Sequence, residues 1–517
     1  MPVTPTYPGV YVEEIPSGVR TITGVATSIT AFIGRALRGP TDEPILLNNY
    51  GEYERIFGGL WNDSTMSFAV RDFYNNGGSQ AVIVRLHKEG TEATLKAGKE
   101  SETTIDLVAA NPGVWGNKLR ARVDRTFPKS ITDQETDTAE QLFNLYIRDG
   151  ETEEVETFLK VSAKYGHPRQ VDKVLENQSN LVRYSGRITA DIPIPTPNND
   201  PLEGDLWSDA NSNKVETQGE DGSAITQAEF IDNKETAKKG LYALENTDLF
   251  NLLCIPPYND DNNIDSGLID AALGYCLKRR AMMIIDSPSE WIDKNTAKQG
   301  IDDSEQVGSV STNGAIFFPR LMMPNPLKEN QIEEFAACGA IAGVFARTDA
   351  SRGVWKAPAG LEAVLKGVTG LSVPLTDPEN GELNPKGINC LRVMPPAGRI
   401  VWGSRTREGD DMLASEWKYI PVRRLALYLE ETLYRNTQWA VFEPNDEPLW
   451  SQLRLNIGAF MQNLFLLHQV ADLPRGYLPE RRAGLVRHCT PDDQLGEACQ
   501  RPGDRKGQTP KRRQDAQ

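Results

Sequence analysis

The chain has 517 residues, with 39% hydrophobic and 25% charged residues, which is typical of a soluble globular protein with roughly three or four domains. Its formal net charge of −16 argues against a general nucleic-acid binder, because such a protein needs a basic face for phosphates. The sequence has no apolar run of about 18 residues and no secretion-signal pattern at its start. We therefore expect a protein that is made in the cytoplasm and does not insert into a membrane.

The cysteine pattern predicts reduced, buried thiols. The spacing contains no CxxC pair, and the first four cysteines lie in apolar or mixed surroundings, which makes a disulfide framework improbable. The six cysteines are Cys254, Cys276, Cys338, Cys390, Cys489 and Cys499.

Residues 1–22 are predicted to form an extended N-terminal arm. Residues 7–16 make a short run with apolar and polar residues in alternation and a proline near each end, a pattern typical of an edge strand. Such a strand must pair with a sheet edge, in its own domain or in a neighbouring subunit. The residues expected to pair are Val10, Tyr11, Val12, Glu13, Glu14 and Ile15.

Residues 23–90 and 235–370 are predicted to form one central α/β domain. Strands are expected at 28–34, 44–47 and 81–85, and a helix at 64–75. Three continuous apolar runs, at 248–256, 281–288 and 315–320, indicate buried strands of a largely parallel sheet. The glycine-rich stretch at 77–80 precedes a strand, whereas nucleotide-binding loops follow one, so it is weak support for a phosphate site.

Between the two parts of this domain the pattern changes. Residues 91–190 are predicted to be an inserted small β-domain, with an alternating strand at 118–124 and a hairpin turning at Asp149-Gly150. Residues 191–234 are rich in Pro, Asn, Asp and Gly, which predicts a polar surface excursion. Residues 371–469 are predicted to form an α+β C-terminal domain, with a strand pair at 389–403 and helices at 420–437 and from 448 onward.

One stretch gathers charges beside an aromatic residue. A helix of small residues, expected from about residue 331, leads into a predicted loop that could be an active site, a rigid joint or a solvated surface. The residues concerned are Arg347, Asp349, Arg352, Trp355 and Lys356. Asp286, at the end of a predicted strand, is a second candidate for chemistry, although a capping or turn carboxylate is the favoured interpretation.

Recognised catalytic patterns are missing from the sequence. It contains no HExxH, GxSxG or GxxxxGK[ST] motif and no metal-spaced Cys/His cluster, and its four histidines are scattered. We therefore expect no enzyme activity, no cofactor and no metal site. The charged stretch then becomes a candidate brace between domains or subunits, and replacing Arg352 or Lys356 by alanine should impair assembly and spare folding.

Several short motifs together resemble the contractile tail sheath family, which forms the outer cylinder of phage tails, tailocins and extracellular contractile injection systems. The resemblance covers about residues 5–469. The motifs are PGVYVEE at 8–14, NPGVWGN at 111–117, LLCIPP at 252–257, RTDASRGVWKAPAG at 347–360, NCLR at 389–392 and VWGSRT at 401–406.

The resemblance implies a subtilisin-like central domain without a catalytic triad. It also implies six-subunit rings that stack around an inner tube, contract, and drive the tube through a target envelope. Subunits would be joined by N- and C-terminal arms that add strands to neighbours, and the assembly would end at baseplate and tail-terminator proteins. In the family a C-terminal-domain helix touches the tube, which makes Arg423 and Arg424 candidates for tube contacts. Alternatives are a tail-terminator or baseplate protein with the same domain, or an α/β hydrolase that uses Asp286.

Residues 470–517 depart from the family pattern, which has a strand-donating segment there. The net charge of this segment is +3, which leaves −19 for residues 1–469, and it contains one aromatic residue, Tyr477, and no Ile or Phe. Such a composition is a poor strand donor and predicts disorder. A shifted reading frame near codon 470 is the favoured explanation, against a truncated gene or a basic tail with its own partner.

Overall fold

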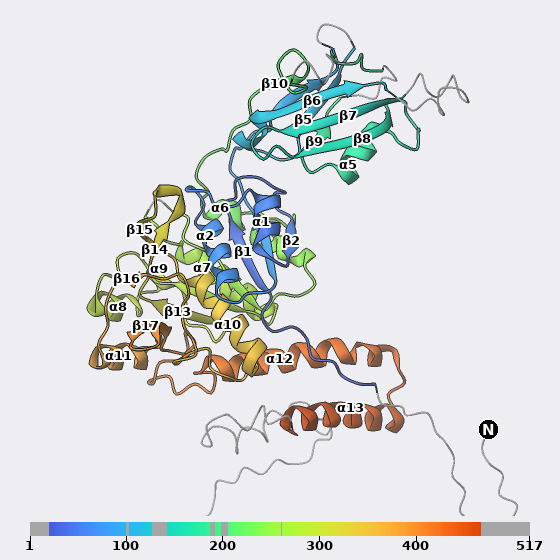
Figure 1. Ribbon diagram of the computed structural model, residues 1–517. Helices are drawn as coiled ribbons and strands as arrows, with labels where there is room; N and C mark the ends of the chain where they lie inside the picture. The colour runs from blue at the N-terminus through green and yellow to red at the C-terminus, as the bar shows by residue number, and fades with distance from the viewer. Residues whose placement is uncertain are drawn as a thin grey trace, which may run out of the picture. The chain divides into compact units, whose positions relative to one another are not determined.

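The computed structural model of the protein describes residues 20–99, 103–126, 142–186, 192–197, 205–259 and 261–466. The chain divides into two compact units (Figure 1). The larger one is residues 24–432, and the smaller one combines the residues up to Thr23 with those from Leu433 onward. Helix α12 (Ile420–Thr437) begins in the larger unit and ends in the smaller one. The predicted arm residues 10–15 and the tail 470–517 lie outside the described residues.

An eight-stranded sheet forms the centre of the larger unit. Its six inner strands pair in parallel, and an antiparallel strand closes each edge, so the predicted largely parallel sheet is confirmed. In sheet order the strands are β18 (Gly398–Val401), β17 (Ile388–Met394), β13 (Gly314–Phe318), β12 (Met282–Asp286), β11 (Leu252–Cys254), β1 (Thr30–Gly34), β3 (Ala81–Arg85) and β2 (Pro44–Leu47).

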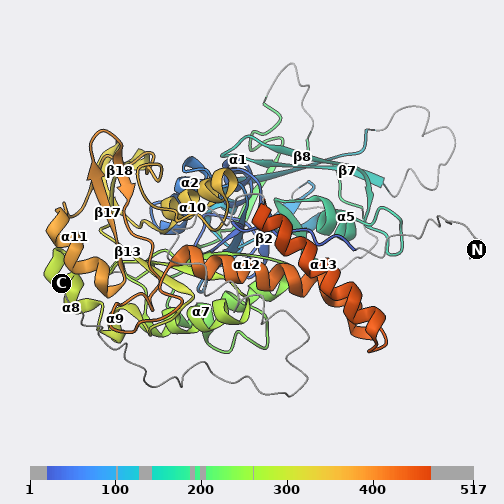
Figure 2. The ribbon, with the colours of Figure 1, turned by 90° about the horizontal axis from the view of Figure 1, so that it is seen from below.

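Helices cover both faces of this sheet, which explains why its strands are continuously apolar. Alternate residues of β1 point to opposite faces: Phe32 belongs to one hydrophobic cluster, and Ala31 and Ile33 belong to the other. The first cluster includes residues of α1 (Tyr50–Phe57), α2 (Thr65–Asn75) and α10 (Cys338–Arg352). The second includes residues of α6 (Gln227–Ile231), η2 (Gly240–Asn246) and α7 (Ser266–Lys278), and Figure 2 shows α7 on the opposite side of the sheet from α2 and α10.

Shorter helices complete the larger unit. Asp293 caps α8, since its Oδ1 accepts from the backbone N–H of Asn295 and of Thr296. The remaining helices are α5 (Val171–Gln178), α8 (Lys294–Gly300), α9 (Ser304–Val307) and α11 (Asp377–Leu383), with 3₁₀ turns η1 (Val114–Lys118), η3 (Pro326–Lys328) and η4 (Asn384–Lys386).

The four buried cysteines of the described residues, Cys254, Cys276, Cys338 and Cys390, are free thiols, as predicted.

The inserted β-domain is a seven-stranded antiparallel sheet with its own core (Figure 1). The predicted hairpin is present as β7 and β8, joined around Gly150. Residues 213–217, which we assigned to a polar surface excursion, instead form a strand between β6 and β4, so that assignment is wrong for them. In sheet order the strands are β8 (Val155–Ser162), β7 (Leu142–Asp149), β6 (Leu119–Asp124), β10 (Asn213–Thr217), β4 (Thr94–Ala97), β5 (Ile105–Ala109) and β9 (Val182–Tyr184).

A three-stranded sheet lies before α10 and corrects a second prediction. We expected a helix from about residue 331, but Gln331–Phe335 is strand β15, which pairs antiparallel with β14 (Leu321–Asn325). Strand β16 (Gly370–Leu371) pairs with the other edge of β14. Helix α10 starts only at Cys338 and continues to Arg352, so three of the charged residues placed on a loop are helical.

The predicted boundary at residue 370 is not a boundary of the sheet. The predicted strand pair is present as β17 and β18, but β17 pairs in parallel with β13 and therefore extends the central sheet. The compact larger unit accordingly continues to Thr432.

No helix among the described residues is long and apolar enough to cross a bilayer.

In the smaller unit, η5 (Gln438–Phe442) leads to α13 (Glu447–Leu466). Asp446 caps α13, since its Oδ1 accepts from the backbone N–H of Leu449 (3.1 Å). The apolar residues of this helix recur at helical spacing but are only partly covered: Leu464 is buried, whereas Trp450, Leu453, Ile457 and Phe460 are half-buried.

Candidate functional site: a buried arginine junction at α10

Helix α10 is fixed at both of its ends. At the start, Asp286 Oδ1 accepts from the backbone N–H of Ala337 (2.7 Å) and of Cys338 (2.8 Å), so the carboxylate at the end of β12 caps the helix. At the end, Gly353 has φ 94° and donates to Asp349 O (2.9 Å). A Cβ at Gly353 would lie 1.9 Å from the Trp355 ring, so only glycine lets this tryptophan fold back there.

The capping interpretation of Asp286 is therefore the correct one. Burial raises the pKa of this carboxyl, while its hydrogen bonds with Cys338 and the charge of Arg320 oppose that shift. The structure thus gives Asp286 a structural role at the start of α10.

Arg347 joins α10 to two neighbouring segments. Its Nη1 donates to Asn76 O (2.8 Å) after α2, and its Nη2 donates to Val364 O (2.7 Å). Asn76 is fully buried, and its Oδ1 accepts from Lys366 N–H (2.8 Å). Burial lowers the pKa of the Arg347 guanidinium. Arg347 therefore satisfies carbonyl groups that would otherwise lack hydrogen-bond partners.

Asp349 and Arg424 form a buried ion pair between α10 and α12. The two carboxylate oxygens accept from Arg424 Nη1 (2.9 Å) and Nη2 (2.6 Å), and the side chains are only 3% and 4% exposed. Arg424 Nη2 also donates to Thr27 O (2.8 Å), and the guanidinium lies 5.1 Å from the centroid of the Phe345 ring. This bidentate geometry fixes the orientation of α12 against α10.

Arg423 is buried beside this pair and faces a different partner. Its Nε and Nη2 donate to Asn313 Oδ1 (3.2 and 3.0 Å), and Asn313 Nδ2 in turn donates to Ala281 O (2.7 Å). The guanidinium stacks 4.9 Å from the centroid of Trp417. Burial lowers the pKa of Arg423, against the charges of Glu430 and Glu408. We call Arg347, Asp349, Arg423 and Arg424 the arginine junction.

The arginine junction corrects our prediction of tube contacts. Arg423 and Arg424 are only 7% and 4% exposed, and both guanidinium groups are bound inside the chain. A buried charge removed from its partner costs several kcal/mol, so neither residue is available for an external surface. Two adjacent arginines at the start of a helix are typical of a solvent-exposed helix end. No local feature of the sequence indicated that Asp349 and Asn313, which are distant in the chain, would bind them.

Arg352 and Lys356 lie outside the junction. Arg352 Nη1 pairs with Glu362 Oε1 (3.0 Å), but the two side chains are 44% and 68% exposed. Lys356 Nζ donates to the carbonyls of Ala357 (3.0 Å) and Ala359 (3.4 Å). We grouped these two residues with Asp349 because they are close in the sequence. In the structure the Asp349 side chain is buried, whereas the Arg352 side chain is exposed.

We expect Arg352→Ala to lower the free energy of unfolding by less than about 1 kcal/mol, because exposed ion pairs contribute little. Urea unfolding followed by tryptophan fluorescence would measure it, with Glu362→Ala as the matched variant. A loss above about 2 kcal/mol in either variant would show that this pair belongs to the core.

Other buried arginines, missed in the sequence, act in the same way. Arg85 donates to the carbonyls of Ala36 (3.0 Å), Gly39 (2.7 Å) and Pro112 (2.8 Å), and burial lowers its pKa to about 10. Arg407 donates to Gly308 O (3.3 Å), and burial likewise lowers its pKa to about 10. These side chains organise backbone carbonyls in loops, a scaffolding role that leaves no signature in a single sequence.

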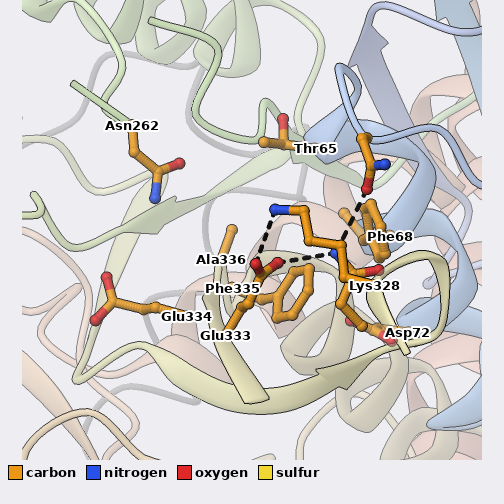
Figure 3. Close-up of a pocket in the computed structure, with 12 residues that line it drawn as sticks. Thr65, Phe68, Asp72, Asn262, Lys328, Glu333, Glu334, Phe335 and Ala336 are labelled. Carbon is orange, nitrogen blue, oxygen red and sulfur yellow. Dashed lines mark hydrogen bonds and ion pairs between the residues drawn. The ribbon is translucent and has the colours of Figure 1, made fainter. Parts of the chain in front are cut away.

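One pocket was also considered as a site. It has a volume of about 150 Å³ and lies between α2 and the β14–β15 hairpin (Figure 3). Glu333 accepts from Lys328 Nζ (2.8 Å) and Asn325 Nδ2 (2.8 Å), so these polar groups are already paired. Asp72 is buried there, which raises its pKa to about 6 despite Arg71. Among the described residues, no three His, Cys, Asp or Glu side chains form a metal-binding group.

Comparison with known proteins identifies part of the chain. Residues 232–407 match the family model of the phage tail sheath protein central domain. This range contains five strands of the eight-stranded sheet and all of α10. These residues are similar to the tail sheath central domain.

Curated relatives of the sheath domain carry consistent names. A prophage major tail sheath protein of Pseudomonas aeruginosa (strain UCBPP-PA14) is 25% identical over 201 residues, 37% of this chain and 47% of that protein. A tail sheath protein of Vibrio phage KVP40 is 33% identical over 135 residues, 26% of this chain and 20% of that protein. The aligned part thus spans less than half the length of either curated relative.

The fold beyond the sheath domain also has a counterpart. The sheath tail protein of Listeria innocua aligns over 86% of this chain and 86% of its own, with a TM-score of 0.57 at 12% identity. At this identity the likeness shows the fold alone. It supports a mixed α/β sheath architecture for most of the described residues.

Proposed function

We propose that the chain is a structural subunit of a contractile tail sheath, in which six-subunit rings stack around an inner tube and contract to push it through a cell envelope. The match of residues 232–407 to the sheath central domain carries this proposal. The partners would be further copies of the chain, the inner tube protein, and baseplate and tail-terminator proteins. The particle would be a phage tail or a related contractile particle made in a bacterium.

The contacts of the charged residues around α10 support a structural role. Asp286 caps the helix, Asp349 forms a buried ion pair, and Arg347 donates hydrogen bonds to backbone carbonyls. These interactions stabilise one arrangement of the core. We further propose that the central sheet is of the subtilisin-like kind without its triad. The energy for contraction would then be stored in the assembly, as small differences between two subunit packings summed over many subunits.

Negative-stain electron microscopy of the chain co-expressed with its tube protein would test this function. We expect rings or short cylinders around the tube, because residues 470–517 contain no Ile or Phe and only one aromatic residue, a composition that disfavours a donated strand. A chimera that carries the C-terminal segment of the Pseudomonas relative should form longer cylinders. Bare tubes beside monomeric chains in both samples would contradict the proposal, and single capping rings would favour a tail terminator.

A further inference from the structure

The first described residues form an extended segment that polar side chains hold by its backbone. In the larger unit, Val25 N–H donates to Thr432 Oγ1 (3.4 Å), and Thr27 O accepts from Arg424 Nη2 (2.8 Å). Asn251, just before β11, brackets the same segment: its Nδ2 donates to Ala26 O (2.8 Å), and its Oδ1 accepts from Ile29 N–H (3.0 Å). Side chains thus bind backbone groups of Val25, Ala26, Thr27 and Ile29, and ladder-like backbone bonding begins at Ile29 O, which accepts from Leu252 N–H (3.1 Å).

In the smaller unit the same mode of binding continues. Asn436 binds both backbone groups of Thr23: its Oδ1 accepts from Thr23 N–H (3.2 Å), and its Nδ2 donates to Thr23 O (3.0 Å). Arg20 N–H donates to Asn456 Oδ1 (3.2 Å) on α13, and the Arg20 guanidinium lies 4.2 Å from the centroid of the Trp439 ring. One amide side chain therefore substitutes for a strand partner at Thr23.

The α12 residues that face the segment recur every four positions. They are Arg424, Tyr428, Thr432 and Asn436. Residues four apart lie on one face of a helix, about 6.0 Å along its axis, and two extended residues span about 6.6 Å. Arg424, eight residues before Thr432, reaches Thr27 with a longer side chain.

The hydrogen bonds above all go to backbone groups of the segment, and Thr23 is exposed. Two side chains of the segment also contribute, since Ile22 is buried and the Arg20 guanidinium lies over the Trp439 ring. At Gly24 a Cβ would lie 2.1 Å from the Tyr428 hydroxyl oxygen, so a larger residue would require this tyrosine side chain to move.

We propose that this face of α12, which we name the α12 clip, holds residues 20–27 in place by their backbone groups. The inference does not rest on the proposed function, because it concerns contacts within a single chain. Because Arg424 binds both Thr27 O and Asp349, tension on the segment would pass through α12 to α10 and the central sheet.

Substitutions at Thr23 test whether the backbone is what the clip holds. Thr23→Pro removes the N–H that donates to Asn436, whereas Thr23→Ala keeps both backbone groups. In the purified single chain, hydrogen exchange of the peptide covering residues 20–27, measured by mass spectrometry, should speed up roughly five- to tenfold for Thr23→Pro. Thr23→Ala should exchange as the wild type does. Equal exchange in all three proteins would overturn the proposal.

The helix side of the clip has its own matched pair. Asn436→Ala should accelerate exchange of the same peptide roughly five- to tenfold, and Gln438→Ala, two residues further along and exposed, should leave it unchanged. In the double variant with Thr23→Pro the effects should not add, because both changes remove one contact. Acceleration spread evenly over α12 and the central sheet would indicate general unfolding and would also overturn the clip.

These measurements distinguish a failure of the α12 clip from a failure of the proposed function. They use single chains and need no assembly, so a failure of the clip appears as unchanged exchange at residues 20–27. A failure of the proposed function appears as an absence of rings with wild-type protein under the microscope.

Discussion

Replacing Gly339 by alanine is expected to lower the free energy of unfolding by about 3 kcal/mol. Gly339 lies in the first turn of α10, where this helix packs on α2. A Cβ there would lie 2.0 Å from Ala69 O and 2.6 Å from Ala69 C, which are backbone atoms and cannot rotate away. The two helices would have to separate inside a fully buried cluster, and this cost exceeds the gain of about 1 kcal/mol in helix propensity.

Gly274→Ala is the matched control for that prediction. Gly274 is also helical, in α7, but a Cβ there would meet no atom within 4 Å. We expect this variant to be more stable than the wild type by up to about 1 kcal/mol, from propensity and reduced freedom of the unfolded chain. Urea unfolding curves of the two variants should thus shift in opposite directions. Equal shifts would mean that α10 and α2 can separate without cost.

Elements governed by local patterns were predictable from the sequence. Strands β12 and β13 are continuous apolar runs because helices cover both of their faces, and that burial is visible in composition alone. Helix α12 was predicted with its observed limits, since its apolar residues recur at helical spacing. The motif at 347–360 lies within the range that matches the sheath central domain, but Arg347, Asp349 and Arg352 are helical and not on a loop.

Elements that depend on distant partners were not predictable. Residues 331–335 became strand β15 because β14 pairs with them, and residues 213–217 became β10 because β4 and β6 leave a place between them. In both cases hydrogen bonding to strands that are distant in the sequence outweighed the local sequence pattern. The boundary at 370 was wrong for the same reason, since the partner of β17 is β13, more than 70 residues earlier.

The candidate site shows this limit most clearly. The sequence predicted an exposed Arg424 because it stands beside Arg423 at a helix start, and its partner Asp349 lies 75 residues away. A buried arginine costs free energy unless a carboxylate or several carbonyls meet it, so its presence in a core implies specific partners. A single sequence cannot name those partners, whereas paired changes at 349 and 424 among relatives would.

The ion pair between Asp349 and Arg424 should respond strongly to removal of either partner. Asp349→Leu leaves the Arg424 guanidinium buried with its hydrogen bond to Thr27 O but without a carboxylate, and Arg424→Met leaves the Asp349 carboxylate buried without its cation. We expect each single change to lower the free energy of unfolding by about 3–5 kcal/mol. Arg352→Ala, three residues along α10 but exposed, provides the control.

The double variant Asp349→Leu/Arg424→Met distinguishes a buried pair from two independent contributions. Because it leaves no unpaired charge in the core, we expect it to be more stable than either single variant, by about 1–4 kcal/mol. Losses that simply add in urea unfolding would show that the residues act separately. The double variant would still lack the bond from Arg424 to Thr27, so hydrogen exchange at residues 20–27 should remain faster than in the wild type. If the double variant regains stability in urea unfolding but still exchanges faster at residues 20–27, then Asp349 acts only in the core. Arg424 would then act both in the core and in the α12 clip.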